Sequence, residues 1–177
     1  MQKENILVVF GYHPKETFAV EVGESLSKKN KNPNIHIVPY TGKKDKGLSS
    51  YQLRSFVEGL DSPNFSVKFP IVLHDDYESL NSSGHGICNA AVIFRSKTKE
   101  ELTQHGKLLR NFVLDYNKPE SSNIVVPGGF LTFNTKYSWI DVELNPKISV
   151  SKAETIVNNL AEYLLKSHNS TQKDKRR

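Results

Sequence analysis

Short apolar runs alternate with amphipathic stretches along most of this 177-residue chain. Continuous apolar runs of this kind are typical of strands that are buried on both faces of a sheet. Turn-forming Asn, Pro and Gly residues separate the later runs from one another. The pattern predicts strands at residues 6–10, 35–38, 70–73, 90–94, 124–126, 130–133 and 138–144.

The stretches between the runs repeat apolar residues at helical spacing, which predicts amphipathic helices. Pro14 suits the first position of the first helix, where its missing N–H costs nothing. The capping-box pattern marks the start of the others at Ser49/Gln52, Thr98/Glu101 and Ser151/Glu154. Strands that alternate with helices predict an α/β fold, a three-layer sandwich in which helices flank a mixed, mostly parallel sheet.

The length fits one domain, which we place at residues 1–168, followed by a disordered basic tail at residues 169–177. The formal net charge is +5, and the end of the chain, Lys173-Asp174-Lys175-Arg176-Arg177, carries much of it. Aromatic residues do not interleave with these basic residues as they do in nucleic-acid stacking platforms. The sequence therefore disfavours a nucleic-acid partner.

Several features favour a cytoplasmic protein without a membrane partner. No apolar run approaches the roughly 18 residues of a membrane span, and the first residues lack the pattern of a signal peptide. The single cysteine, Cys88, agrees with a reducing compartment. Because Cys88 lies beside Ala90, Ala91 and Val92, we expect a small buried hydrophobic residue rather than a nucleophile.

Polar residues follow several of the expected strands at the point where each strand ends. In open α/β sheets, ligands gather outside the carboxyl ends of the strands, so we expect these side chains to share one sheet edge. They are His13 and Glu16 after the first strand, His74, Asp75 and Asp76 after the third, Arg95 after the fourth, and Glu143 near the end of the last.

Two histidines and one carboxylate, with a fourth position left open for water, form a common type of catalytic zinc site. His13 and Glu16 are three residues apart at an expected helix start, where both can reach one ion. His74 is the expected third ligand. His85 is a rival in a glycine-rich loop, but a strand end positions a ligand more rigidly than a loop does. Glu143 is our choice for the base that takes the proton from the metal-bound water.

Each of these residues also has an ordinary structural interpretation. Glu16 alone is a first-turn acid that the helix dipole favours, and His74 alone is a polar group that ends a strand. Asp75 and Asp76 either orient a ligand from behind or are solvated turn residues. The combination, rather than any single residue, predicts the metal site.

The motif His13-Pro14-Lys15-Glu16, the segment VLHDD at residues 72–76 and the late glutamate Glu143 resemble the zinc carboxypeptidase superfamily. Within it, they most resemble the succinylglutamate desuccinylase and aspartoacylase branch. The resemblance spans residues 6–145. It implies one zinc ion held by His13, Glu16 and His74, with Glu143 as general base and acid. It also implies hydrolysis of an amide bond next to a carboxylate-bearing group, in an N-acyl amino acid or at a peptide C-terminus.

The chain departs from this family at the Asn-Arg pair that usually binds the substrate carboxylate. Arg54 and Arg95 are the only arginines before residue 110. Arg95 follows an expected strand and is the better replacement, whereas Arg54 lies inside an expected helix. Guanidinium geometry suits a carboxylate in either case.

Other functional classes remain as alternatives. The missing Asn-Arg pair supports a nonenzymatic α/β binding module whose metal site is vestigial or absent. The first expected strand is followed by Gly11-Tyr12-His13-Pro14 rather than by a Gly-x-Gly-x-x-Gly loop, and no Gly-Lys-Ser/Thr element is present. These two observations disfavour a Rossmann dinucleotide site and a P-loop.

Overall fold

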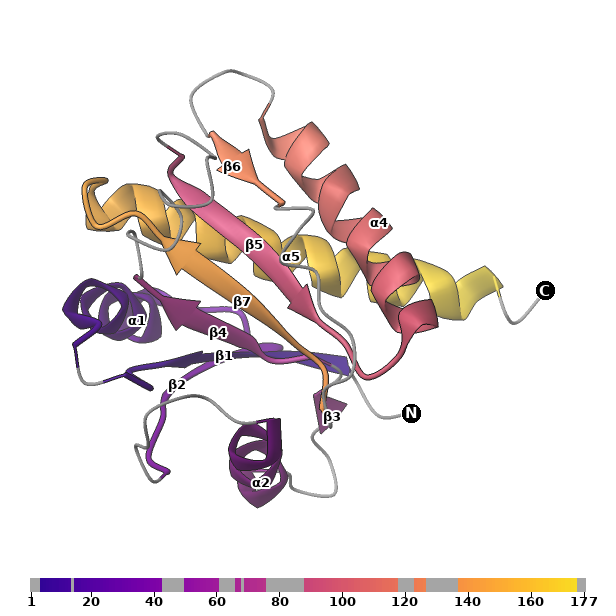
Figure 1. The fold of residues 1–177 in the computed structure, drawn as a ribbon, viewed down its shortest axis with the longest axis horizontal. Helices are drawn as coiled ribbons and strands as arrows, with labels where there is room; N and C mark the ends of the chain where they lie inside the picture. The colour runs from indigo at the N-terminus through magenta and orange to yellow at the C-terminus, as the bar shows by residue number, and fades with distance from the viewer. Residues whose placement is uncertain are drawn as a thin grey trace.

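The computed structural model describes residues 4–13, 15–42, 50–60, 66–67, 69–75, 88–117, 123–126 and 137–174. Its elements follow the chain from the N-terminus to the C-terminus (Figure 1). They are β1 Glu4–Phe10, α1 Thr17–Lys29, β2 Ile35–Pro39, α2 Ser50–Leu60, β3 Ser66–Val67, β4 Ile71–His74, β5 Ala90–Arg95, α4 Lys99–Tyr116, β6 Ile124–Val125, β7 Trp139–Leu144 and α5 Val150–Asp174. The predicted strand at 130–133, Pro14, Asp76 and His85 lie outside the described residues.

The strands form one mixed sheet with the order β2-β1-β4-β7-β5-β6, and β3 pairs with the start of β1. Neighbours are parallel from β2 through β1 and β4 to β7. The pair of β5 with β7 is antiparallel, and β6 is parallel to β5. The sheet and the helices that flank it confirm the predicted fold class.

The two faces of the sheet carry different apolar clusters, because side chains alternate along each strand. The larger cluster joins one face to α1, α4 and α5, as Ile140, Val142 and Leu144 of β7 show. The smaller cluster joins the opposite face to α2, through Leu53 and Val57. The helices therefore form two layers, one on each side of the sheet (Figure 1).

Two helix boundaries differ from the predicted ones. The N-cap of α1 is Glu16, so the helix begins at Thr17 rather than at Pro14. The first turn of α5 is capped by Ser149, whose hydroxyl accepts from the Lys152 amide at 3.2 Å, and not by the predicted Ser151 and Glu154 pair. Glu154 instead binds Lys29 of α1, with 2.9 Å between the ammonium nitrogen and a carboxylate oxygen.

The end of the chain also differs, because α5 continues to Asp174 whereas the sequence predicted disorder from residue 169. Cys88 is fully buried beside Ala91, as expected of a small hydrophobic residue. In the part of the chain that the structure describes, every helix is too short or too polar to span a bilayer.

Candidate metal and catalytic site

Strand pairing places His74 and Glu143 beside each other. β4 and β7 are parallel neighbours, and His74 pairs in register with Glu143. Residues in register on parallel strands project from the same face, which here is the face covered by α2. Glu143 is half-buried, and its charge contributes to raising the pKa of His74. Both predicted strand ends are therefore confirmed as neighbours, while the catalytic role of Glu143 stays a prediction.

His13 and Glu16 come from the turn between β1 and α1. Gly11 adopts a φ of 75°, a conformation that glycine tolerates readily, and lets the chain leave the end of β1. The Glu16 amide then donates to the His13 carbonyl at 3.2 Å. This turn, and not the face of a helix as the sequence reasoning assumed, brings the two side chains together. Both residues precede α1, which begins only at Thr17.

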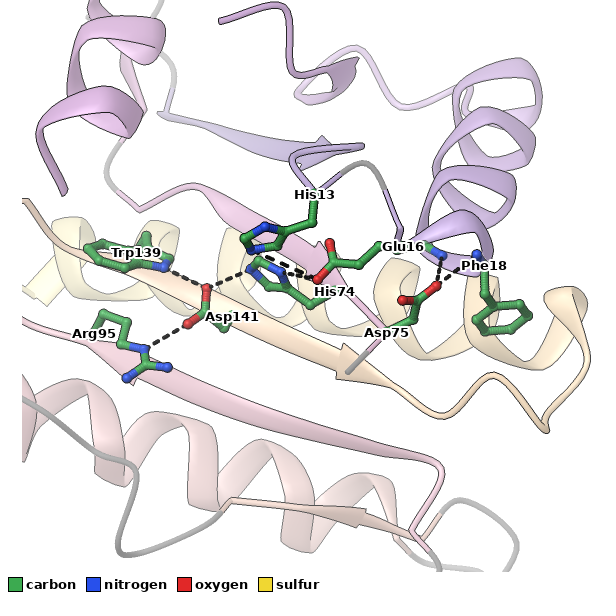
Figure 2. A network of polar contacts seen from close by, with 9 residues as sticks. His13, Glu16, Phe18, His74, Asp75, Arg95, Trp139 and Asp141 are labelled. Carbon is green, nitrogen blue, oxygen red and sulfur yellow. Dashed lines mark hydrogen bonds and ion pairs between the residues drawn. The ribbon is translucent and has the colours of Figure 1, made fainter. Parts of the chain in front are cut away.

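The three predicted ligands converge in the structure (Figure 2). One donor atom from each of His13, Glu16 and His74 lies within 4.8 Å of the others. The Nδ1 atom of His74 is 3.0 Å from Oε1 of Glu16, and the Nε2 atom of His13 is 4.0 Å from the same oxygen. The His13 side chain is 30% exposed, which leaves an approach from solvent, whereas the Glu16 and His74 side chains are nearly buried.

Asp75 holds the segment that carries Glu16. One of its carboxylate oxygens accepts from the amides of Phe18 and Ala19, at 2.7 and 3.0 Å. These amides belong to the first turn of α1, where helix N–H groups have no partner inside the helix. The Glu16 side chain does not cap its own helix. Asp75, next to His74, therefore ties the turn with Glu16 to the end of β4.

Asp141 is a site residue that the sequence reasoning missed. It lies on β7, two residues before Glu143, and is 4% exposed. Its Oδ1 accepts from the Trp139 indole nitrogen at 2.6 Å and lies 3.3 Å from Nε2 of His74. Its Oδ2 accepts from Nε of Arg95 at 2.7 Å. A signal was present, since an acid two residues before Glu143 must share its face.

The predicted position of Arg95 is wrong. Because β5 runs antiparallel to β7, Arg95 lies opposite Trp139 at the beginning of β7, and Ala91 pairs with Glu143. Arg95 is four residues beyond Ala91, the residue of β5 that pairs with Glu143. At about 3.3 Å per residue, this places Arg95 roughly 13 Å from Glu143 along the strand. Its side chain reaches back only as far as Asp141. The sequence does not reveal the direction of β5, so it could not place Arg95.

Arg54 lies on α2, where its side chain is 54% exposed and pairs with Glu58 at 2.6 Å. Tyr12, next to His13, is fully buried and donates its hydroxyl hydrogen to Gln52 of α2. Its ring meets the His13 ring edge-on, with 4.7 Å between centroids. Roles for Arg54 and Arg95 in substrate binding stay predictions.

The electrostatics of the site centre on His74. Burial favours the neutral ring, but hydrogen bonds to Asp141 and Glu16 outweigh it and hold the pKa of His74 well above its usual value. Burial likewise opposes ionisation of Asp141, yet its contacts with His74 and Arg95 lower the pKa of this carboxyl group. Each ring nitrogen of His74 thus faces a carboxylate, Glu16 at Nδ1 and Asp141 at Nε2.

The residues present fit a zinc ion. Two imidazole nitrogens and a carboxylate are the donor types that zinc prefers. Within the described part of the chain, the buried Oε2 of Glu16 has no hydrogen-bond partner. Glu16 and Asp141 both contact His74, and the negative charge around this ring favours a divalent cation over a neutral group. Such a cation would replace the proton on Nδ1 of His74.

Comparison with known proteins identifies the fold. No protein-family model matches the sequence, and no curated protein matches it. The catalytic domain of CwlV, an N-acetylmuramoyl-L-alanine amidase from Bacillus (Paenibacillus) polymyxa var. colistinus, is similar in structure, with a TM-score of 0.53 and 12% identity. The match covers 93% of this chain and 98% of that one.

Two further structures share the fold. Murine aminoacylase 3 has a TM-score of 0.52 and 13% identity, over 96% of this chain and 67% of that one. AmiC2 of Nostoc punctiforme, an N-acetylmuramoyl-L-alanine amidase, has a TM-score of 0.50 and 12% identity, over 93% of this chain and 97% of that one. The chain therefore has a fold that amidases and an aminoacylase also have.

Proposed function

We propose that this protein is a zinc-dependent hydrolase that cleaves an amide bond by attack of water. The substrate class is an N-acyl amino acid or a peptide C-terminus. The observation that carries the proposal is the convergence of His13, Glu16 and His74, with Glu143 in register beside His74. Amide hydrolysis by a metal needs three protein ligands, an open position and a nearby proton acceptor. His13, Glu16 and His74 are the candidate ligands, and Glu143 is the candidate proton acceptor. The partly exposed His13 marks the side from which water can approach.

In this proposal, bound zinc would polarise the scissile carbonyl and acidify the attacking water. His13, Glu16 and His74 would hold the ion. The Glu143 carboxylate would accept a proton from the water as the water oxygen bonds to the carbonyl carbon. The same carboxyl group would then give that proton to the amide nitrogen as the C–N bond breaks. The products are a carboxylic acid and an amine.

The names of the structural neighbours support the proposed substrate class. An aminoacylase and two N-acetylmuramoyl-L-alanine amidases have the same fold. N-Acetylmuramoyl-L-alanine is itself an amino acid with an acylated nitrogen. N-acyl amino acids are therefore the substrate class suggested both by the sequence resemblance and by the names of the structural neighbours.

A nonenzymatic binding module is the second candidate. The observation that favours it is the pair of hydrogen bonds from His74 to Glu16 and Asp141, because these partners satisfy the ring without a metal. This alternative predicts that His74 stays paired with Glu16 and Asp141. It also predicts that the protein binds zinc far more weakly than structural or catalytic zinc sites do.

An assay with and without zinc tests the proposed function. We expect zinc-loaded protein to release free amine from at least one member of a panel of N-acyl amino acids, N-acetylmuramoyl-L-alanine and short peptides. A chelator should abolish this release, and zinc should restore it, because Glu143 has no acidified water to deprotonate without the ion. Equal release from chelated and zinc-loaded protein would contradict the proposal.

A further inference from the structure

Asp141 is the acidic residue of the site that the proposed chemistry leaves without a role. It is buried on β7 and receives three side-chain contacts, from His74, Trp139 and Arg95. A buried carboxylate is costly unless its oxygens are matched by donors. Here both oxygens are matched, and each donor comes from a different direction (Figure 2).

We propose that Asp141 is a positioning residue that fixes the ring orientation and tautomer of His74 for metal binding. The inference rests on the proposed function, since it takes His74 as a metal ligand. Asp141 lies behind the ring, at Nε2, while Glu16 lies at Nδ1, 3.0 Å away. Asp141 is thus on the side of His74 opposite the ligand cluster.

The chemistry follows from the proton inventory of histidine. A neutral imidazole carries one N–H, and only its other nitrogen can donate a lone pair to a metal. Oδ1 of Asp141 lies 3.3 Å from Nε2 and already accepts from Trp139, so it favours the N–H at Nε2 and leaves the Nδ1 lone pair facing His13 and Glu16. A carboxylate behind a ligating imidazole also raises the basicity of the ligand.

Trp139 and Arg95 hold Asp141 in this orientation. The Trp139 indole nitrogen and Nε2 of His74 share Oδ1, whereas Arg95 takes Oδ2. The carboxylate plane is therefore fixed from both ends. This contact makes Arg95 a partner of Asp141, while its role in substrate binding stays a prediction.

Replacing Asp141 with asparagine tests the role, because an amide cannot serve all three donors. If its oxygen faces His74 and Trp139, its NH₂ group opposes the Arg95 donor. If the amide is reversed, the NH₂ group donates to Nε2 of His74, and the N–H of the neutral ring moves to Nδ1. That tautomer cannot bind a metal through Nδ1.

Zinc affinity, measured by competition with a chromogenic chelator, is the readout. We expect Asp141→Asn to weaken zinc binding by about 10- to 100-fold, the usual effect of losing a partner of a ligand. Glu21→Gln is the control for charge, because it removes one negative charge at an exposed position of α1 outside the ligand cluster. The zinc affinity of Glu21→Gln should equal that of the native protein, because solvent and salt screen the charge of an exposed side chain.

Two further measurements keep the test decisive. Trp139→Phe removes one donor to Asp141 without changing any charge, and we expect it to weaken zinc binding several-fold even if Asp141→Asn does not fold. With Co²⁺ in place of zinc, the visible absorption bands should shift in Asp141→Asn and stay unchanged in Glu21→Gln, because only Asp141 contacts a proposed ligand.

The outcomes separate this inference from the proposed function. Native protein that does not bind zinc refutes both. If the native protein binds zinc and Asp141→Asn binds it no more weakly than Glu21→Gln, the positioning role alone is refuted. If Asp141→Asn does not fold, a zinc affinity of Trp139→Phe equal to that of the native protein refutes the positioning role of Asp141.

Discussion

Replacing Glu143 with glutamine is expected to lower kcat by about 10²- to 10⁴-fold while zinc binding is retained. Glutamine keeps the size and shape of the side chain but cannot accept the proton of the attacking water. Glu143 lies beside His74 and is half-buried, so no bulk base can readily take its place. The effect should fall mainly on kcat, because the proton moves in the chemical step.

The measurement is steady-state amine release by zinc-loaded protein, on the substrate found in the panel. Glu21→Gln, at an exposed position of α1, is the matched control and should leave kcat unchanged. A Glu143→Gln variant that retained zinc and kept kcat within a few-fold of the native value would remove Glu143 from the mechanism.

Replacing His74 with alanine is expected to destabilise the metal-free protein by about 3–5 kcal/mol, as when one partner of a buried ion pair is removed. Glu16 would lose its contact with Nδ1 of His74 at 3.0 Å, and Asp141 would lose its contact with Nε2. Asp141 still accepts hydrogen bonds from Arg95 and Trp139. Most of the loss of stability therefore comes from Glu16, whose buried carboxylate loses its contact with His74.

Urea unfolding of chelator-treated protein measures this difference. His13→Ala is the matched control, since it also removes a proposed ligand. The His13 side chain is 30% exposed and lies 4.0 Å from Glu16, so we expect its loss to cost no more than about 1 kcal/mol. Equal destabilisation by the two substitutions would mean that the contacts of His74 do not have the importance assigned to them here.

The sequence was most informative where a strand ends in a polar residue. The buried runs before His13 and His74 were recognised by their apolar character, and parallel pairing then brought their ends to one edge. Glu143 followed from the same reasoning applied to β7. The fold class and the convergence of these side chains could therefore be predicted, because both depend on short-range pattern and on a general rule of α/β sheets.

The remaining site features depend on tertiary structure. Arg95 was misplaced because nothing in its neighbourhood reveals that β5 runs antiparallel to β7. Asp141 lies inside β7 rather than at its end, so the rule of strand ends does not select it, although alternation places it on the face of Glu143. Asp75 caps α1 from 56 and 57 residues away, a contact that no local pattern encodes.

The zinc content of the purified protein tests the central claim most directly. Elemental analysis should find close to one zinc ion per native chain and almost none in the His13→Ala, His74→Ala double variant, which lacks two of the three ligands. A native protein that contains no zinc, even after incubation with zinc and removal of the excess, would contradict the account. The His74 contacts would then be a buried ion pair in a binding module.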